Sequence, residues 1–102
     1  MKVTVKFVKE YLAEQQKLLM EYIDFDDETV LAKGNPIELI DKRKLPEYTQ
    51  RLQDIEYAYI CKIYNIEYND DLEFNTLINT IKKFRKEHKC KSLGELISFL
   101  QQ

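Results

Sequence analysis

The chain is poor in the residues from which active sites and disulfide frameworks are built. Its 102 residues include two glycines, two prolines, two cysteines, one histidine and no tryptophan. Cys61 and Cys90 form no C-x-x-C pair, and two cysteines do not make a disulfide scaffold. The sequence holds no glycine-rich nucleotide loop, and one histidine leaves little from which to build a catalytic centre. We therefore expect a non-enzymatic protein with no cofactor and no metal site, whose thiols stay free in a reducing cytoplasm.

Long apolar runs are also missing. No stretch approaches the ~20 apolar residues that span a bilayer, and the first eight residues do not form a secretory signal. These absences predict a cytoplasmic protein without membrane contact. Hydrophobic residues make up 44% of the chain and charged residues 33%, which predicts one folded domain over residues 1–102. Seven tyrosines and five phenylalanines in so small a domain predict a homodimer, and the frequent Ile, Lys, Glu, Asn and Tyr are typical of an AT-rich bacterial or mobile-element gene.

The hydrophobic period changes near the start of the chain. Val3, Val5 and Phe7 alternate with polar residues, which predicts a short strand over residues 2–7. From Val8 to Ile23 the apolar residues recur every three or four positions, which predicts an amphipathic helix.

Residues 28–41 fit two structures. In the first, Gly34 and Asn35 form the turn of a β-hairpin, and Pro36 begins the returning strand. In the second, Asn35 is the N-cap of a helix that has Pro36 in its first position and Glu38 as the capping-box partner. We adopt the hairpin as the working interpretation.

The remainder of the chain predicts three helices, over residues 46–65, 70–89 and from Ser92 onward. Asn69 is the expected N-cap of the second of these, and the third opens with a capping box from Ser92 to Glu95. The side chains expected to be buried in these two helices are Phe74, Leu77, Ile78, Ile81, Phe84, His88, Leu93, Leu96, Ile97 and Leu100. The predicted fold class is therefore α+β and mostly helical, a small helical domain with a β-hairpin in a winged-helix-like arrangement.

Basic residues are concentrated in one window although the net charge is −2. Six of the sixteen lie between Lys82 and Lys91. On a helix, one face would combine amides that can read adenine with lysines that can hold phosphates. That face consists of Asn75, Asn79, Lys82, Lys86 and Lys89, flanked by Lys83. The hairpin would add a second set of contacts, namely Lys33, Asn35, Lys42, Arg43 and Lys44.

These features predict a DNA-binding accessory or regulatory protein that contacts double-stranded DNA. Helices 46–65 and 70–89 loosely resemble a helix-turn-helix, and a basic hairpin beside a helical pair is what winged-helix domains use. Both likenesses are architectural only. The alternative is a protein-binding adaptor or inhibitor of the phage- or plasmid-encoded type, acting through acidic surfaces and the tyrosines between Tyr57 and Tyr68. Two basic segments on one side of the molecule would favour DNA, whereas segments on opposite sides would favour the adaptor.

Overall fold

The computed structural model describes residues 3–23 and 40–100, and helices are the regular elements of this part of the chain. Helix α1 spans Val5–Tyr22, α3 spans Leu45–Ile63, α4 spans Phe74–His88 and α5 spans Leu93–Leu100. The described residues contain no strand, so the predicted α+β class and the winged-helix-like arrangement are wrong for them. The predicted hairpin turn at Gly34 and Asn35 falls in residues 24–39, which lie outside the described residues.

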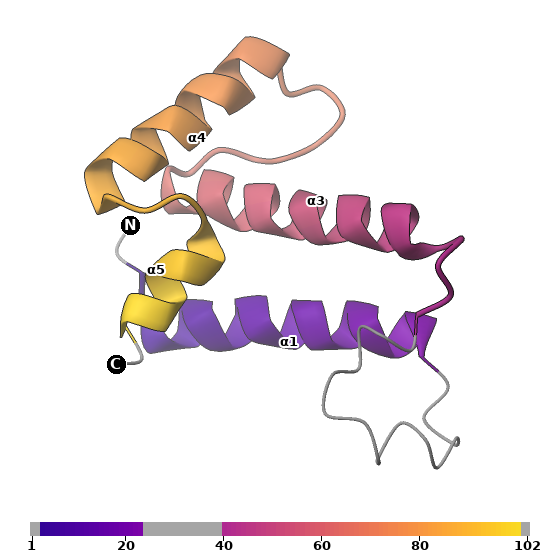
Figure 1. Cartoon of the computed structure of the whole chain (residues 1–102). Coiled ribbons are helices and arrows are strands. Elements are labelled where there is room, and N and C mark those ends of the chain that lie inside the picture. Colours follow the sequence, from indigo (N-terminus) through magenta and orange to yellow (C-terminus); the bar gives the residue numbers. More distant parts are fainter. Residues whose placement is uncertain (1–2, 24–39, 101–102) are drawn as a thin grey trace.

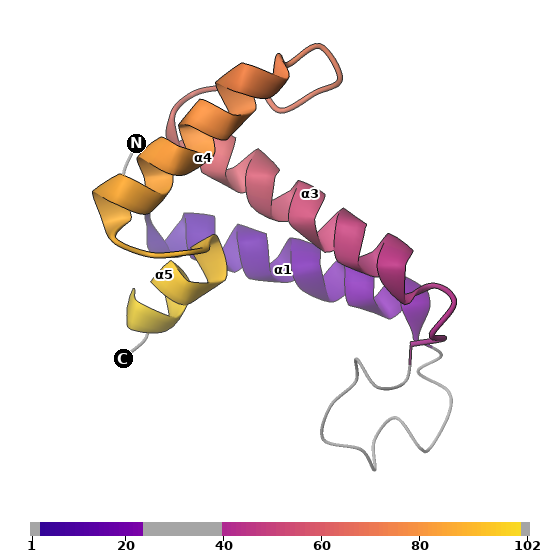
Figure 2. The same ribbon diagram turned by 45° about the horizontal axis from the view of Figure 1, so that its top comes forward.

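The helices form an antiparallel pair with a shorter pair at one end. α1 and α3 lie side by side and run in opposite directions (Figure 1). α4 packs on the C-terminal part of α3, and α5 comes back towards the N-terminal half of α1, as the second view also shows (Figure 2). The C-terminal end of α4 and the whole of α5 therefore lie at the end of the molecule where α1 begins and α3 finishes, whereas the first turn of α4 projects away from it (Figure 1).

The first residues form the start of α1 rather than a strand. Thr4 is the N-cap, and its hydroxyl oxygen accepts a hydrogen bond from the Phe7 N–H at 3.1 Å. A threonine cap satisfies one of the free amide groups at a helix start. Phe7 and Tyr11 are buried one helical turn apart, so the same residues that alternate also carry a helical stripe. The strand predicted for residues 2–7 is wrong because six residues are too few to separate the two periods.

The helix predicted over residues 46–65 is confirmed as α3, within two residues at each end. Pro46 lies in its first turn, where a missing N–H costs nothing. One side of α3 packs its aromatic residues against α1, as two ring contacts demonstrate. The rings of Phe7 and Tyr59 have centroids 5.4 Å apart, and so do those of Tyr22 and Tyr48.

Helix α4 begins four residues later than the sequence predicts. The Asn69 side chain accepts from the Asp71 N–H at 2.9 Å, so this residue makes a local turn and caps no helix. The N-cap is Glu73, and Phe74, the first helical residue, is 72% exposed instead of buried. The helix ends at Lys89, whose left-handed backbone (φ 50°) closes the last turn with an N–H bond to the Arg85 carbonyl.

Helix α5 is held by two amide contacts at its start. The Glu95 N–H donates to the Ser92 hydroxyl at 3.1 Å, as the predicted capping box requires. The Leu93 N–H donates to the Glu56 carboxylate of α3 at 2.8 Å. Leu93, Leu96 and Ile97 are buried as predicted, but Leu100 is 57% exposed.

The core consists of two clusters. The larger one joins α1, α3, α4 and α5, and its buried members are Phe7, Tyr11, Ile60, Ile63, Phe84, Cys90, Leu93, Leu96 and Ile97. The smaller one lies at the other end of the α1–α3 pair and comprises Leu18, Ile23, Ile40 and Tyr48. Ile55 packs against both clusters and so connects them.

Candidate nucleic-acid interface

The residues predicted to contact nucleic acid on α4 do share one exposed face. At 100° per residue, Asn75, Asn79, Lys82 and Lys86 fall within one sector of the helix, and the C-cap residue Lys89 follows its last turn; all five are exposed. The opposite side of the helix carries the buried residues Thr80, Ile81 and Phe84. We call the five exposed residues the basic face. Because the helix is anchored by its other side, the basic face is free to meet a ligand.

The lysines of the basic face are not neutralised by neighbouring acids. Lys82, Lys86 and Lys89 make no ion pair with any residue in the described part of the chain. Lys83, which flanks the face, is engaged differently, because its ammonium lies 4.9 Å from the Tyr64 ring centroid and 4.0 Å from the Glu87 carboxylate. The face therefore presents three uncompensated positive charges to solvent.

The two remaining charged side chains of the last turns of α4 stabilise the fold. The Arg85 guanidinium donates to the Lys91 carbonyl at 3.0 Å, across the turn that leads to α5. Glu87 accepts a hydrogen bond from the Tyr64 hydroxyl at 2.8 Å, which joins α4 to the end of α3. This bond and burial raise the pKa of Tyr64, so its hydroxyl stays protonated at neutral pH.

Charge is distributed unevenly along α4. Three exposed acids, Asp70, Asp71 and Glu73, precede its first turn, and the basic residues occupy its second half. Carboxylates near a helix start and cations near its end are both favoured by the helix dipole. A polyanion laid along the whole helix would meet the acids as well as the lysines. The basic residues that α4 could offer to phosphates therefore lie in the half that begins at Lys82.

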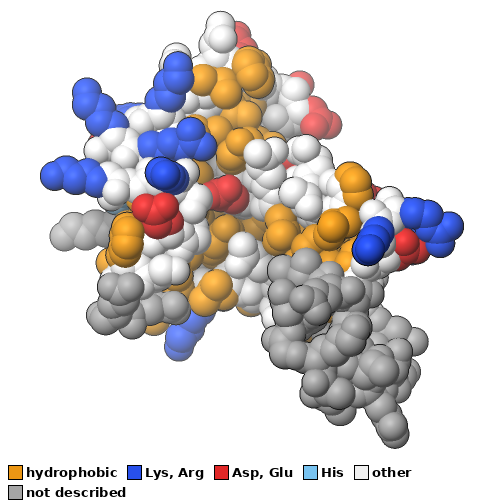
Figure 3. All heavy atoms as spheres, in the orientation of Figure 1, with side chains coloured by type: hydrophobic (Ala, Val, Ile, Leu, Met, Phe, Trp, Pro, Cys, Tyr) orange, Lys and Arg blue, Asp and Glu red, His pale blue; other side chains and the backbone are white. Residues whose placement is uncertain are grey.

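The second predicted set of contacts does not join the first. Lys42, Arg43 and Lys44 lie just before α3, and α3 places them about 28 Å from the end that packs on α4. In Figure 3 the basic side chains accordingly gather at two separate ends of the molecule. Arg43 is also paired with Asp41 at 3.0 Å, which lowers the pKa of that carboxyl. Lys33 and Asn35, the other members of the set, lie outside the described residues.

The connection between α3 and α4 differs from that of a helix-turn-helix. The connection runs over residues 64–73, far longer than the three or four residues of that motif. Tyr68 of this connection packs back on α3. Tyr57 and Tyr68 have ring centroids 6.5 Å apart, and the Tyr68 hydroxyl donates to Asp54 at 3.1 Å. Tyr57 and Tyr68 are thus only half-exposed and already make ring and hydrogen-bond contacts within the chain.

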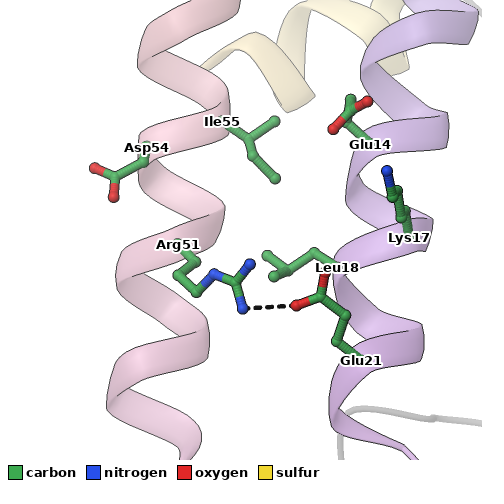
Figure 4. A pocket seen from close by; sticks show the side chains of 7 residues that line it. All are labelled: Glu14, Lys17, Leu18, Glu21, Arg51, Asp54 and Ile55. Carbon is green, nitrogen blue, oxygen red and sulfur yellow. Dashed lines mark hydrogen bonds and ion pairs between the residues drawn. The ribbon is translucent and has the colours of Figure 1, made fainter. Parts of the chain in front are cut away.

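A groove between α1 and α3 is lined mostly by charged side chains (Figure 4). Its volume is about 370 Å³, and Glu14, Lys17 and Asp54 are among the side chains that line it. At one end the Arg51 guanidinium meets the Glu21 carboxylate at 2.7 Å. Three acids and two bases line the groove, and the Arg51–Glu21 pair engages one of each, so the lining carries only one net negative charge.

The groups that could support chemistry are engaged in packing. His88 is half-buried, as its place on the apolar stripe predicts, and its ring centroid lies 5.0 Å from that of Phe84. Burial raises the pKa values of the Cys61 and Cys90 thiols, which keeps them in the unreactive protonated form. Within residues 3–23 and 40–100, no three His, Cys, Asp or Glu side chains are placed to hold a metal ion.

No family model matches the chain, and comparisons with curated proteins and with solved structures found no match either. No helix among the described residues has the length and apolar character needed to cross a membrane.

Proposed function

We propose that this protein is a non-enzymatic nucleic-acid-binding accessory protein that holds phosphates through the basic face of α4. The observation that supports the proposal is the set of three exposed lysines, Lys82, Lys86 and Lys89, which lack ion-pair partners within the described residues. They span about 10 Å of the helix axis, a length over which duplex DNA carries several phosphates. Lysine acts on phosphate as a point charge and tolerates many geometries.

The proposal predicts weak and salt-sensitive binding. Each lysine that neutralises a phosphate releases condensed counterions, so three contacts give a slope of about −3 in a plot of log affinity against log salt. The net charge of −2 and the acids before α4 repel the rest of the polyanion. The small number of phosphate contacts and this repulsion limit the affinity for DNA. They favour a role in which the protein binds beside another DNA-bound component.

The test is a fluorescence anisotropy titration of a labelled duplex at several salt concentrations. Replacing Lys82, Lys86 and Lys89 with Gln should weaken binding and remove most of the salt slope. The matched control replaces Lys17, Lys42 and Lys44 with Gln, which changes the net charge equally but at a distance from α4. The control should keep the slope. Equal losses in both variants would mean that net charge, or the segment of Lys42 and Lys44, contributes as much as the basic face and would contradict the proposal.

A second candidate function, a protein-binding adaptor, is favoured by one observation. Lys42 to Lys44 lie at the far end of α3 from the basic face, so the two basic segments do not form one surface. The same titration separates the two functions. If neither duplex nor single-stranded DNA binds at low salt, the adaptor becomes the better account.

A further inference from the structure

An apolar groove lies between the N-terminal half of α1 and α5. Its volume is about 380 Å³, within the range of ligand pockets, and most of its lining is aliphatic. Val5, Leu12 and Leu100 contribute to it while remaining 72%, 39% and 57% exposed. Lys9 is the one charged residue in the lining. This groove is an apolar surface that the described residues leave uncovered, although Val3 and Val8 of its lining pack against the larger core cluster.

An apolar knob stands on a different part of the molecule. Phe74, the first residue of α4, is 72% exposed, although the spacing of apolar residues in α4 predicts that it is buried. Asp70, Asp71 and Glu73 are exposed just before it. Phe74 is thus an exposed aromatic ring that directly follows an acidic segment of the chain.

The knob and the groove are complementary in both shape and charge. An aromatic ring fits a groove of this volume and would bury apolar surface on both sides. The acids that precede the ring would lie near Lys9, which lines the groove, is exposed and makes no ion pair within the described residues. Such complementarity of charge steers association and fixes its register.

The two surfaces cannot meet within one molecule. The first turn of α4 lies at the top of the view in Figure 1, away from α5 and the N-terminal half of α1, whose residues line the groove, and the turned view in Figure 2 keeps them apart. We propose that Phe74 of one copy inserts into the α1–α5 groove of a second copy. This contact is head-to-tail, so its repetition gives a closed ring or an open chain of molecules instead of a two-fold dimer.

The contact is independent of the proposed nucleic-acid binding. It uses none of the lysines of the basic face, which lie in the second half of α4, although Phe74 adjoins Asn75 at the other end of that face. A single side chain in a groove buries less than the ~800 Å² per partner of a standard stable interface, so we expect reversible association.

The test is sedimentation of the full chain from about 1 to 500 μM, because mass action drives a weak contact at high concentration. The wild-type chain should exceed its monomer mass of 12.3 kDa progressively, without stopping at a dimer. Phe74→Asp removes the knob, and Val5→Asp places a repelling charge in the groove. Val5 begins α1, where an acidic residue is favoured, so this variant should keep its fold by circular dichroism. Each variant alone should stay monomeric.

Mixing the two variants provides the decisive measurement. Phe74→Asp retains an intact groove and Val5→Asp retains an intact knob, so an equimolar mixture should form one contact and stop at twice 12.3 kDa. The control is Phe99→Asp, which changes a 51% exposed phenylalanine of α5 that does not line the groove and should associate as the wild type does. A monomeric wild type, a Phe74→Asp variant that associates normally, or a mixture that stays monomeric would each overturn the proposal.

Discussion

The hydrogen bond between Glu56 and the start of α5 should make a measurable contribution to stability. Its carboxylate accepts from the Leu93 N–H at 2.8 Å, where helix α5 has a free amide group and the positive end of its dipole. Glu56 is half-buried in α3, so this bond fastens the last helix to the centre of the domain. Glu56→Ala removes both the charge and the acceptor.

The expected loss follows from the kind of bond. Hydrogen bonds to charged groups contribute about 1.5–3 kcal/mol, and partial exposure places Glu56 near the lower end. We expect Glu56→Ala to reduce the free energy of unfolding by about 1.5–2 kcal/mol. Glu56→Gln keeps an oxygen acceptor but loses the charge, so it should lose about 0.5–1 kcal/mol, as for a neutral hydrogen bond.

Urea denaturation followed by circular dichroism measures these losses as shifts of the midpoint at constant slope. Glu67→Ala is the matched control, since Glu67 is exposed and accepts no hydrogen bond from the described residues. The control should unfold as the wild type does. If Glu56→Gln is as damaging as Glu56→Ala, or if neither differs from the control, the bond to α5 does not have the role assigned to it.

Three further predictions concern the backbone, the tyrosines and sequence recognition. Lys89→Gly should stabilise the fold by about 0.5–1 kcal/mol in the same denaturation assay, because Lys89 has a left-handed backbone (φ 50°) that glycine adopts without strain; an unchanged midpoint would contradict this. Burial raises the pKa values of Tyr11 and Tyr68 to about 12, so the stability that these protonated hydroxyls contribute is complete below pH 10 and is lost as pH rises towards 12. In an alkaline titration, tyrosinate absorbance should therefore rise together with unfolding. Full ionisation of all tyrosines in the folded chain near pH 10 would contradict this. If α4 reads a defined DNA site, Asn75→Ala and Asn79→Ala should each cost about 1–3 kcal/mol on that site and leave random duplexes unaffected, as competition binding would measure.

The sequence predicted the fold best where an apolar stripe was long. Helix α3 has five apolar side chains at regular spacing over four turns, and no competing period fits them. At the N-terminus, the apolar pattern of residues 2–7 fits both a strand and a helix. The hydrogen bond between the Thr4 hydroxyl and the Phe7 amide favours the helix. A preference that depends on one capping bond is too small for a pattern of alternation to detect.

The candidate surfaces could be predicted only in part. Helical geometry was enough to place Asn75, Asn79 and the lysines of α4 on one face, because that inference depends on a single helix. The separation of Lys42 to Lys44 from that face depends on how α3 and α4 pack. The spacing of residues along the sequence carries no information about that packing. The exposure of Phe74 follows from the late start of α4, for which the turn at Asn69 was the available signal.

The division of the core into two clusters has a consequence for how the molecule opens. The smaller cluster, around Leu18 and Tyr48, buries few side chains, and Ile55 packs against both this cluster and the larger one. Amide protons around it should therefore exchange with solvent through a partial opening that leaves the rest of the domain protected. Both the basic face and the α1–α5 groove belong to the helices around the larger cluster. Either surface could thus remain assembled while the opposite end of the α1–α3 pair frays.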